Sequence, residues 1–296
     1  MFFAAFTTLL LAVSSVMANK SQQAWGPMRA NLGRLLLAFV ALGGWALCFG
    51  GGVSGAGFGQ FFLSGALGIG IGDMAFFATL PLLGSRLTTV MMQCLAVPTA
   101  IIVEWLWLDT PLSPAQLACT GVVLAGIIIA LLPTKKDPPK VRVKVSGVFF
   151  GIIAAVSQGL GAVFSRRGFA VANASGHPID GFTAAFQRNL GGLGLTVVFF
   201  VIWLVVQGQS EKSRPVRTAK DYQWMLGNAL AGPIFGMGTM QLALATTPSG
   251  IVLPIMATTP LLVIPVAYWI EHERPTKRSL VGGIVAVGGA VALTLV

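Results

Sequence analysis

The chain has 296 residues, of which 55% are hydrophobic and only 9% are charged. Soluble globular proteins carry about 25% charged residues because their surfaces face water, so this composition excludes an ordinary soluble fold. The net charge of +10 does not predict a nucleic-acid partner, because the basic residues lie between apolar segments rather than on one basic domain.

Apolar segments of roughly 20 residues, the length of a helix that crosses a lipid bilayer, recur along the chain. They predict an all-α polytopic membrane protein, with the lipid bilayer as its surroundings. Ten transmembrane helices are expected, at residues 2–18, 32–50, 61–82, 87–108, 114–133, 146–165, 181–206, 223–243, 250–270 and 278–296.

The first of these segments has an alternative interpretation. Its apolar run ends in a small-residue stretch at Ala18, which is typical of a signal peptide cleavage site, but no positive charge precedes the run. We therefore expect it to be the first membrane span.

No catalytic, nucleotide-binding or metal-binding motif is present. Cys48, Cys94 and Cys119 lie in apolar spans without metal spacing, and His177 and His272 lie in loops. We expect no enzyme activity, no metal and no cofactor.

Basic residues predict the orientation in the membrane. Sixteen of the nineteen Lys and Arg residues fall in or beside the odd-numbered loops, counted from the N-terminus. Because cytoplasmic loops are enriched in Lys and Arg, these loops are predicted to be cytoplasmic in a multi-pass protein of the cell membrane, with both termini outside.

The two halves of the chain resemble each other. At a shift of 162 positions Pro98 aligns with Pro260, Trp107 with Trp269, and Gly126 with Gly288. The predicted organisation is a five-helix repeat at 1–133, a basic linker at 134–145 and a second five-helix repeat at 146–296. Five is an odd number, so the second repeat should enter the membrane inverted, as in many secondary transporters that bind substrate between their halves.

A family resemblance follows from four features of the first half. They are a Gly-Asp pair in the third span (Gly72-Asp73), a proline in the fourth (Pro98), an acid-x-Pro-Leu-x-Pro turn from 109 to 114 and a glycine-containing fifth span. The segment at 247–296 resembles the corresponding end of the second half. This pattern is similar to the EamA-type transporters of the drug/metabolite transporter superfamily. The resemblance implies ten helices and ATP-independent export or exchange of small metabolites. Many members keep both termini in the cytoplasm, opposite to the orientation that the charges predict here.

Asp73 is the principal candidate for function. It lies near the middle of the third span, where a carboxylate costs about 2.5–3.5 kcal/mol on insertion scales and should face the bundle interior or water. It could bind a cationic group, take up a proton as the coupling ion, or form a structural hydrogen bond. Its counterpart in the second half is Phe235, so the repeat alone does not require it.

Other polar residues within the spans are candidates for lining a substrate or coupling-ion cavity. They are Ser14, Ser15, Gln93, Gln158, Asn189, Gln241, Thr258 and Thr259. Arg188 is predicted to reach the membrane surface in preference to pairing with an anionic substrate, and Glu104 is predicted to be interfacial.

Prolines inside the predicted fourth and ninth spans free backbone carbonyls and are hinge candidates. They are Pro98, Pro254, Pro260 and Pro265.

The predicted function is secondary transport of a small polar metabolite or drug by alternating access, with protons or a second solute as the coupling partner. The alternative is a structural or channel-like membrane protein in which the repeat serves packing only.

Overall fold

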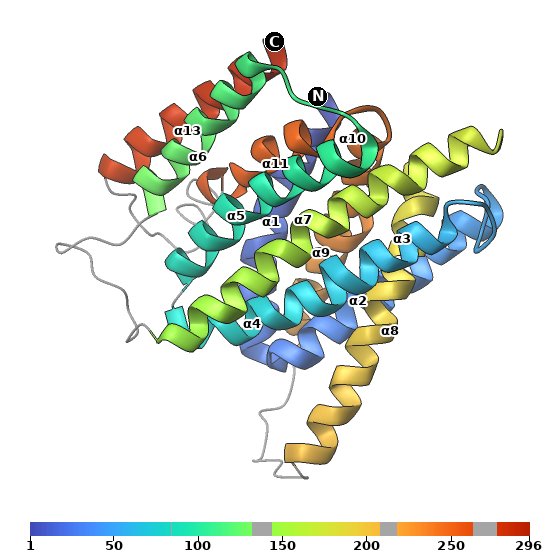
Figure 1. The fold of residues 1–296 in the computed structure, drawn as a ribbon. Coiled ribbons are helices and arrows are strands. Elements are labelled where there is room, and N and C mark those ends of the chain that lie inside the picture. The colour runs from blue at the N-terminus through green and yellow to red at the C-terminus, as the bar shows by residue number, and fades with distance from the viewer. Residues whose placement is uncertain (84, 132–143, 208–217, 263–276) are drawn as a thin grey trace.

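The computed structural model describes residues 1–83, 85–131, 144–207, 218–262 and 277–296, and in these residues every regular element is helical (Figure 1). The elements are α1 (Phe2–Trp25), α2 (Pro27–Cys48), α3 (Phe58–Gly65), η1 (Ala66–Ile71), α4 (Gly72–Leu83), α5 (Ser85–Leu108), α6 (Pro114–Leu131), α7 (Val145–Ala174), α8 (Gly181–Gln207), α9 (Ala219–Ala229), η2 (Leu230–Ile234), α10 (Phe235–Thr246), α11 (Ser249–Ala257) and α13 (Lys277–Leu295).

Seven helical stretches in the described residues are long and apolar enough to cross a membrane. Three shorter apolar helices, at Pro114–Ala130, Ser249–Leu262 and Leu280–Leu295, coincide with the fifth, ninth and tenth predicted spans. Large apolar side chains such as Val40, Leu47 and Val205 are exposed on the outside of the bundle. This surface suits lipid, and the chain is therefore a polytopic helical membrane protein.

Several helices run further than the sequence pattern predicted, and α1 and α7 are extended most at one end. Helix α1 continues from residue 18 to Trp25, where Gly26 adopts a positive φ of 78° and Pro27 starts α2. Only glycine enters this backbone region readily, and proline suits a helix start, so the two residues together make the tight turn. Helix α7 continues past residue 165 to Ala174, and Arg166 in this extension forms an ion pair inside the bundle.

The third and eighth spans share the same irregularity. Each is α-helical at both ends and contains a π-helical turn in the middle, η1 in the third span and η2 in the eighth. At the shift of 162 positions, Leu230 of η2 falls on Gly68 of η1. Pro233 accounts for the break in η2, whereas η1 has no proline and contains two glycines.

The helix contacts keep the same pattern when the two halves are exchanged. The third span (α3, η1, α4) packs on α7, and the eighth (α9, η2, α10) packs on α1. Helix α5 packs on α7 as α11 packs on α1, while α2 pairs with α8 and α6 with α13. Figure 1 shows α6 and α13 side by side at one edge of the molecule.

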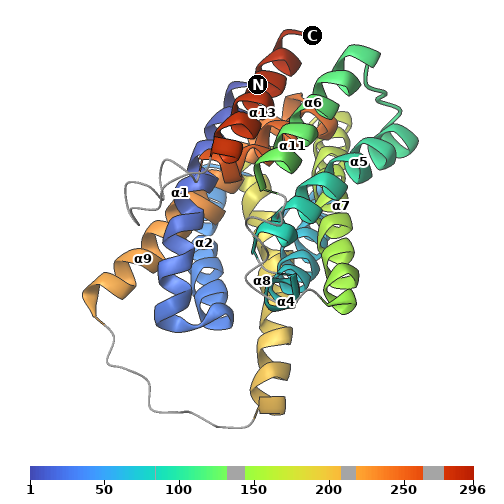
Figure 2. The same cartoon turned by 90° about the vertical axis from the view of Figure 1, so that its left-hand side faces the viewer.

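The two termini lie at the same end of the molecule, as Figures 1 and 2 show. We call this the terminus end, and the opposite end, where α6 stops and α7 begins, the linker end. Because successive spans alternate in direction, the start of α2 and the end of α4 lie at the linker end. The ends of α5 and α7 and the start of α11 lie at the terminus end.

Glycines bring the third span against α8. A Cβ atom on Gly191 would lie 1.9 Å from the backbone oxygen of Phe62, and one on Gly65 would lie 1.7 Å from the backbone oxygen of Arg188. Because these contacts are with backbone, no side chain can move aside to relieve them. Helices in lipid have no hydrophobic driving force for association. Van der Waals packing at this close approach therefore holds the two helices together.

Replacing Gly191 by alanine should therefore destabilise the bundle by about 1–3 kcal/mol or more, the range of overpacked sites. Gly194→Ala is the matched control, because it lies on the same helix and its Cβ would have nothing within 4 Å. Denaturant unfolding in detergent, followed by tryptophan fluorescence, measures both. Equal stabilities for the two variants would contradict the packing described here.

Candidate functional site

Asp73 forms an ion pair inside the bundle. Its Oδ2 accepts a 2.8 Å hydrogen bond from Nη2 of Arg34 on α2, and Arg34 Nε donates to Oδ1 of Asn31 at 2.8 Å. The side chains of Asp73 and Arg34 are 22% and 21% exposed. Arg34 lies about two turns after the start of α2, so this ion pair lies toward the linker end and remains partly accessible.

A second ion pair lies toward the terminus end. Glu104, four residues before the end of α5, accepts from Nε of Arg166 at 3.2 Å and from the backbone N–H and the hydroxyl of Ser249. Arg166 also donates to the carbonyl of Leu244 at 2.8 Å. Glu104 is 2% exposed and Arg166 18%. The cluster ties α5 to α7, α10 and α11, so Glu104 faces the inside of the bundle, and its depth relative to the membrane surface stays a prediction.

Arg188 on α8 lies buried between these two ion pairs. It is 1% exposed and is the largest of the fully buried side chains in the described residues. The prediction that it reaches the membrane surface is wrong. Its Nη2 lies beside Gly68 of η1, where an added Cβ would approach it to 2.8 Å. Gly68 precedes Asp73 by five residues on the same span, which places Arg188 on the terminus-end side of Asp73.

Two of the predicted amides are buried close to Arg188. Gln241 on α10 is fully buried, and its Nε2 donates to Ser165 Oγ at 3.0 Å. Ser165 shares a 2.8 Å hydrogen bond with Ser64 on α3. Asn189, next to Arg188, donates to the carbonyl of Leu35 at 3.2 Å. The side-chain carbonyl oxygens of Gln241 and Asn189 have no hydrogen-bond partner.

The other predicted cavity residues lie outside this group. Ser14 is buried against α9, donating to Asn228 Oδ1 at 2.9 Å, whereas Ser15 is exposed and bonds the carbonyl of Leu11 in its own helix. Gln93 on α5 and Gln158 on α7 are half-buried. Of these four residues, only Ser14 forms a polar contact between helices that are distant in sequence.

Thr258 and Thr259 are buried at the end of α11 and bond to their own helix. Thr259 donates to the carbonyl of Met256 at 2.5 Å, the carbonyl that Pro260 leaves without its usual amide partner. Thr258 donates to the carbonyl of Ile255 at 2.7 Å. These hydroxyls therefore supply hydrogen-bond donors to backbone carbonyls at the end of α11.

The predicted hinge prolines have different surroundings. Pro98 lies inside α5 and Pro254 inside α11, while Pro260 follows α11 in helical backbone. Pro265 and most of the predicted linker 134–145 lie outside the described residues.

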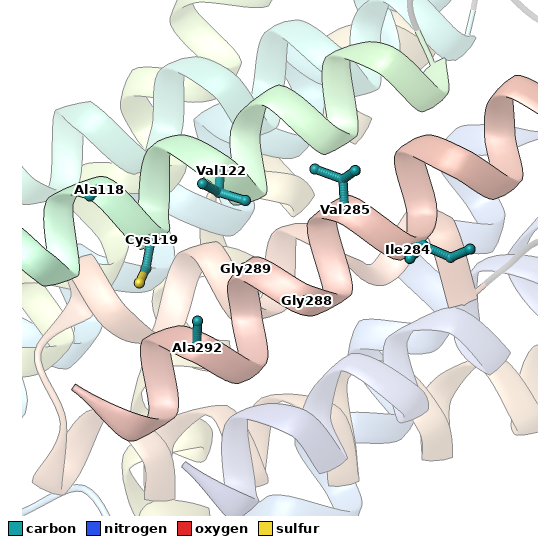
Figure 3. Close-up of a pocket in the computed structure, with 8 residues that line it drawn as sticks. All are labelled: Ala118, Cys119, Val122, Ile284, Val285, Gly288, Gly289 and Ala292. Carbon is teal, nitrogen blue, oxygen red and sulfur yellow. The ribbon is translucent and has the colours of Figure 1, made fainter.

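One pocket lies away from all of these residues, between α6 and α13. It has a volume of about 420 Å³, opens on the outside of the bundle and is lined by apolar side chains and glycines (Figure 3). Its lining, which includes Cys119, Val122 and Ile284, offers no group for binding a polar solute. Among the described residues no group of three His, Cys, Asp or Glu side chains could hold a metal ion.

Comparison with known proteins agrees with this architecture. No curated protein matches the chain. A solved structure described as "Crystal structure of protein" superposes with a TM-score of 0.76 at 15% identity, covering 99% of this chain and 95% of its own, which shows a shared fold. The model of the EamA-like transporter family matches residues 1–132 and 145–295. The chain therefore belongs to the EamA-like transporter family of the drug/metabolite transporter superfamily.

Proposed function

We propose that this protein is an ATP-independent secondary transporter that exports or exchanges small polar metabolites or drugs across the cell membrane by alternating access. The observation that carries the proposal is the presence of two ion pairs within the spans, Asp73–Arg34 toward the linker end and Glu104–Arg166 toward the terminus end. Charges inside membrane spans are costly and mark pathways for ions or substrates.

We further propose ten membrane crossings in two inverted five-helix halves. The exchange pattern of the helix contacts and the π-helical turns at equivalent positions of the third and eighth spans support this arrangement. Both termini at one end of the molecule require an even number of crossings. The three shorter apolar helices complete the count of ten.

In this scheme each ion pair closes one end of the pathway. The Glu104 cluster joins helices of both halves, and Glu104 is almost fully buried, whereas Arg166 and both partners of the Asp73 ion pair are each about one-fifth exposed. The deeper burial of Glu104 supports a conformation that is closed at the terminus end. Transport would require the two clusters to break in turn, with a proton or a second solute exchanging against the substrate.

We propose that the linker end faces the cytoplasm, as the excess of Lys and Arg in the odd-numbered loops predicts. A reporter enzyme fused after Val296 should then be active only outside the cytoplasm. Activity of the same fusion inside the cytoplasm would reverse the orientation and leave the transport mechanism unchanged.

Transport is tested in two steps. Metabolite profiles of cells with and without the protein identify candidate solutes, and proteoliposomes loaded with each candidate then measure exchange against labelled external solute without ATP. Saturable, protein-dependent exchange supports the proposal. Flux that does not saturate would favour a channel-like protein, and no flux for any solute would favour the packing-only alternative.

A further inference from the structure

The buried guanidinium of Arg188 has no anionic partner among the described residues. The contact it makes is from Nη1 to the sulfur of Met240 at 3.9 Å, and its Nε has no hydrogen-bond partner. A guanidinium has five N–H donors and stays charged in proteins. Removing one partner from a buried ion pair costs several kcal/mol, so an unpaired guanidinium inside a membrane span requires a counter-charge from another source.

The surroundings of Arg188 are built from small residues and adaptable backbone. Gly68 in the π-helical turn η1 lies against Nη2, and Gly161 of α7 lies against Gly68. Ser64 of α3 donates to the carbonyl of Gly161 at 2.5 Å and continues through Ser165 to Gln241. π-helical turns inside helices occur frequently at functional sites. Helices from both halves therefore meet here, and the chain of hydrogen bonds from Ser64 to Gln241 starts one turn before Gly68.

The charges in this region do not balance. Arg34 and Arg188 are positive and Asp73 is negative, and Asp73 is already hydrogen-bonded to Arg34. Arg188 interacts electrostatically with Asp73 but makes no contact with it within 4 Å. With Asp73 ionised, the three side chains together carry one uncompensated positive charge, which a bound anion would neutralise.

We propose that Arg188 binds an oxyanion, a carboxylate or a phosphate, carried by the transported metabolite. This inference rests on the proposed transport function and names its substrate class. The planar fork of an arginine pairs with such oxyanions through two parallel hydrogen bonds. The unpartnered carbonyl oxygen of Gln241 supplies an acceptor for a hydroxyl or amino group on the same molecule. Asp73 keeps Arg34 occupied, which leaves Arg188 as the anion site.

Ligand stabilisation of the full-length protein in lipid nanodiscs tests this site, with the seven tryptophans as the fluorescence signal for thermal unfolding. The probes are inorganic phosphate and glutamate as oxyanions, choline as the cation and glycerol as the neutral solute, at matched ionic strength. Phosphate, glutamate or both should stabilise the wild type, and which of them does so distinguishes a phosphate site from a carboxylate site. Stabilisation by choline alone would overturn the proposal.

Two pairs of variants locate the binding. Arg188→Gln should abolish the stabilisation by the oxyanion, whereas Arg167→Gln removes the same charge about two turns before the end of α7 and should leave it unchanged. Gly68→Ala should weaken oxyanion affinity at least about tenfold, because charge-assisted hydrogen bonds contribute roughly 1.5–3 kcal/mol each. Gly194→Ala, on α8 with open space around its Cβ, should leave the affinity unchanged. Equal stabilisation of the wild type, Arg188→Gln and Gly68→Ala would overturn the proposal.

Failure of the anion site and failure of the transport function give different results. If Arg188→Gln does not fold, Gly68→Ala decides the outcome, because that variant keeps the charge of Arg188. Exchange of choline but of neither oxyanion in proteoliposomes would leave transport standing and remove the anion site. If an oxyanion binds in a way that depends on Arg188 but no solute is exchanged, the anion site is supported and the transport function is contradicted.

Discussion

Glu104→Gln should destabilise the protein by about 3–5 kcal/mol, the cost of breaking a buried ion pair by removing one partner. Glu104 accepts hydrogen bonds from Arg166 and from both the N–H and the hydroxyl of Ser249. A neutral amide offers one oxygen in place of two and cannot neutralise Arg166, which then keeps only the carbonyl of Leu244. Unfolding in detergent, followed by tryptophan fluorescence, measures the loss.

A double-mutant cycle separates the free energy of the ion pair from the effect of changing the shapes of the two side chains. Arg166→Met alone should also be destabilising, but Glu104→Gln combined with Arg166→Met should lose less than the sum of the two, because neither charge is then left unpaired. Arg167→Gln is the matched control on the same helix. A Glu104→Gln protein within about 0.5 kcal/mol of wild type, the range of ordinary surface substitutions, would contradict the cluster.

Asp73→Asn should reduce transport by at least about tenfold while the protein inserts and folds, since charge-assisted hydrogen bonds contribute roughly 1.5–3 kcal/mol. The substitution leaves Arg34 and Arg188 in the spans without the carboxylate that faces both of them. The measurement is initial exchange rate in proteoliposomes across a range of pH, normalised to the amount of inserted protein.

The double variant Asp73→Asn with Arg34→Gln distinguishes two roles for Asp73. If Asp73 only neutralises Arg34, removing both charges should restore exchange. If Asp73 takes up the coupling proton, the double variant should stay inactive, and any residual exchange should lose its pH dependence. An Asp73→Asn protein that exchanges at the wild-type rate at every pH would exclude Asp73 from coupling.

The sequence predicted the helical spans well because their signal is local. Long apolar runs require helices in lipid whatever they pack against. The ends of the helices were less predictable where a charged residue lies inside the bundle. The predicted sixth span ended at residue 165, just before Arg166, yet Arg166 lies within α7 and donates to Glu104, 62 positions earlier in the chain.

The candidate site was only partly predictable, because its residues meet across the two halves. Asp73 stood out as a carboxylate within an apolar run, but its partner Arg34 comes from a neighbouring span. Span order carries a further signal. In alternating spans the end of α5 and the end of α7 lie on the same side, so span order places Glu104 and Arg166 at the same end of the bundle. The burial of Arg188 had no such signal, because it depends on the glycines that face it.

Alternating access is tested most directly by labelling one buried position from each side of the membrane. In a protein with Cys48, Cys94 and Cys119 replaced by serine, Gln241→Cys places a thiol beside the Ser165–Ser64 network. A membrane-impermeant thiol reagent, applied to either face of oriented vesicles, should reach it from both. Cross-linking the end of α5 to the start of α11 through two introduced cysteines that leave Glu104 and Ser249 in place should close the terminus end, so that labelling continues only from the linker end. Labelling from neither face, or labelling from both faces after cross-linking, would contradict alternating access.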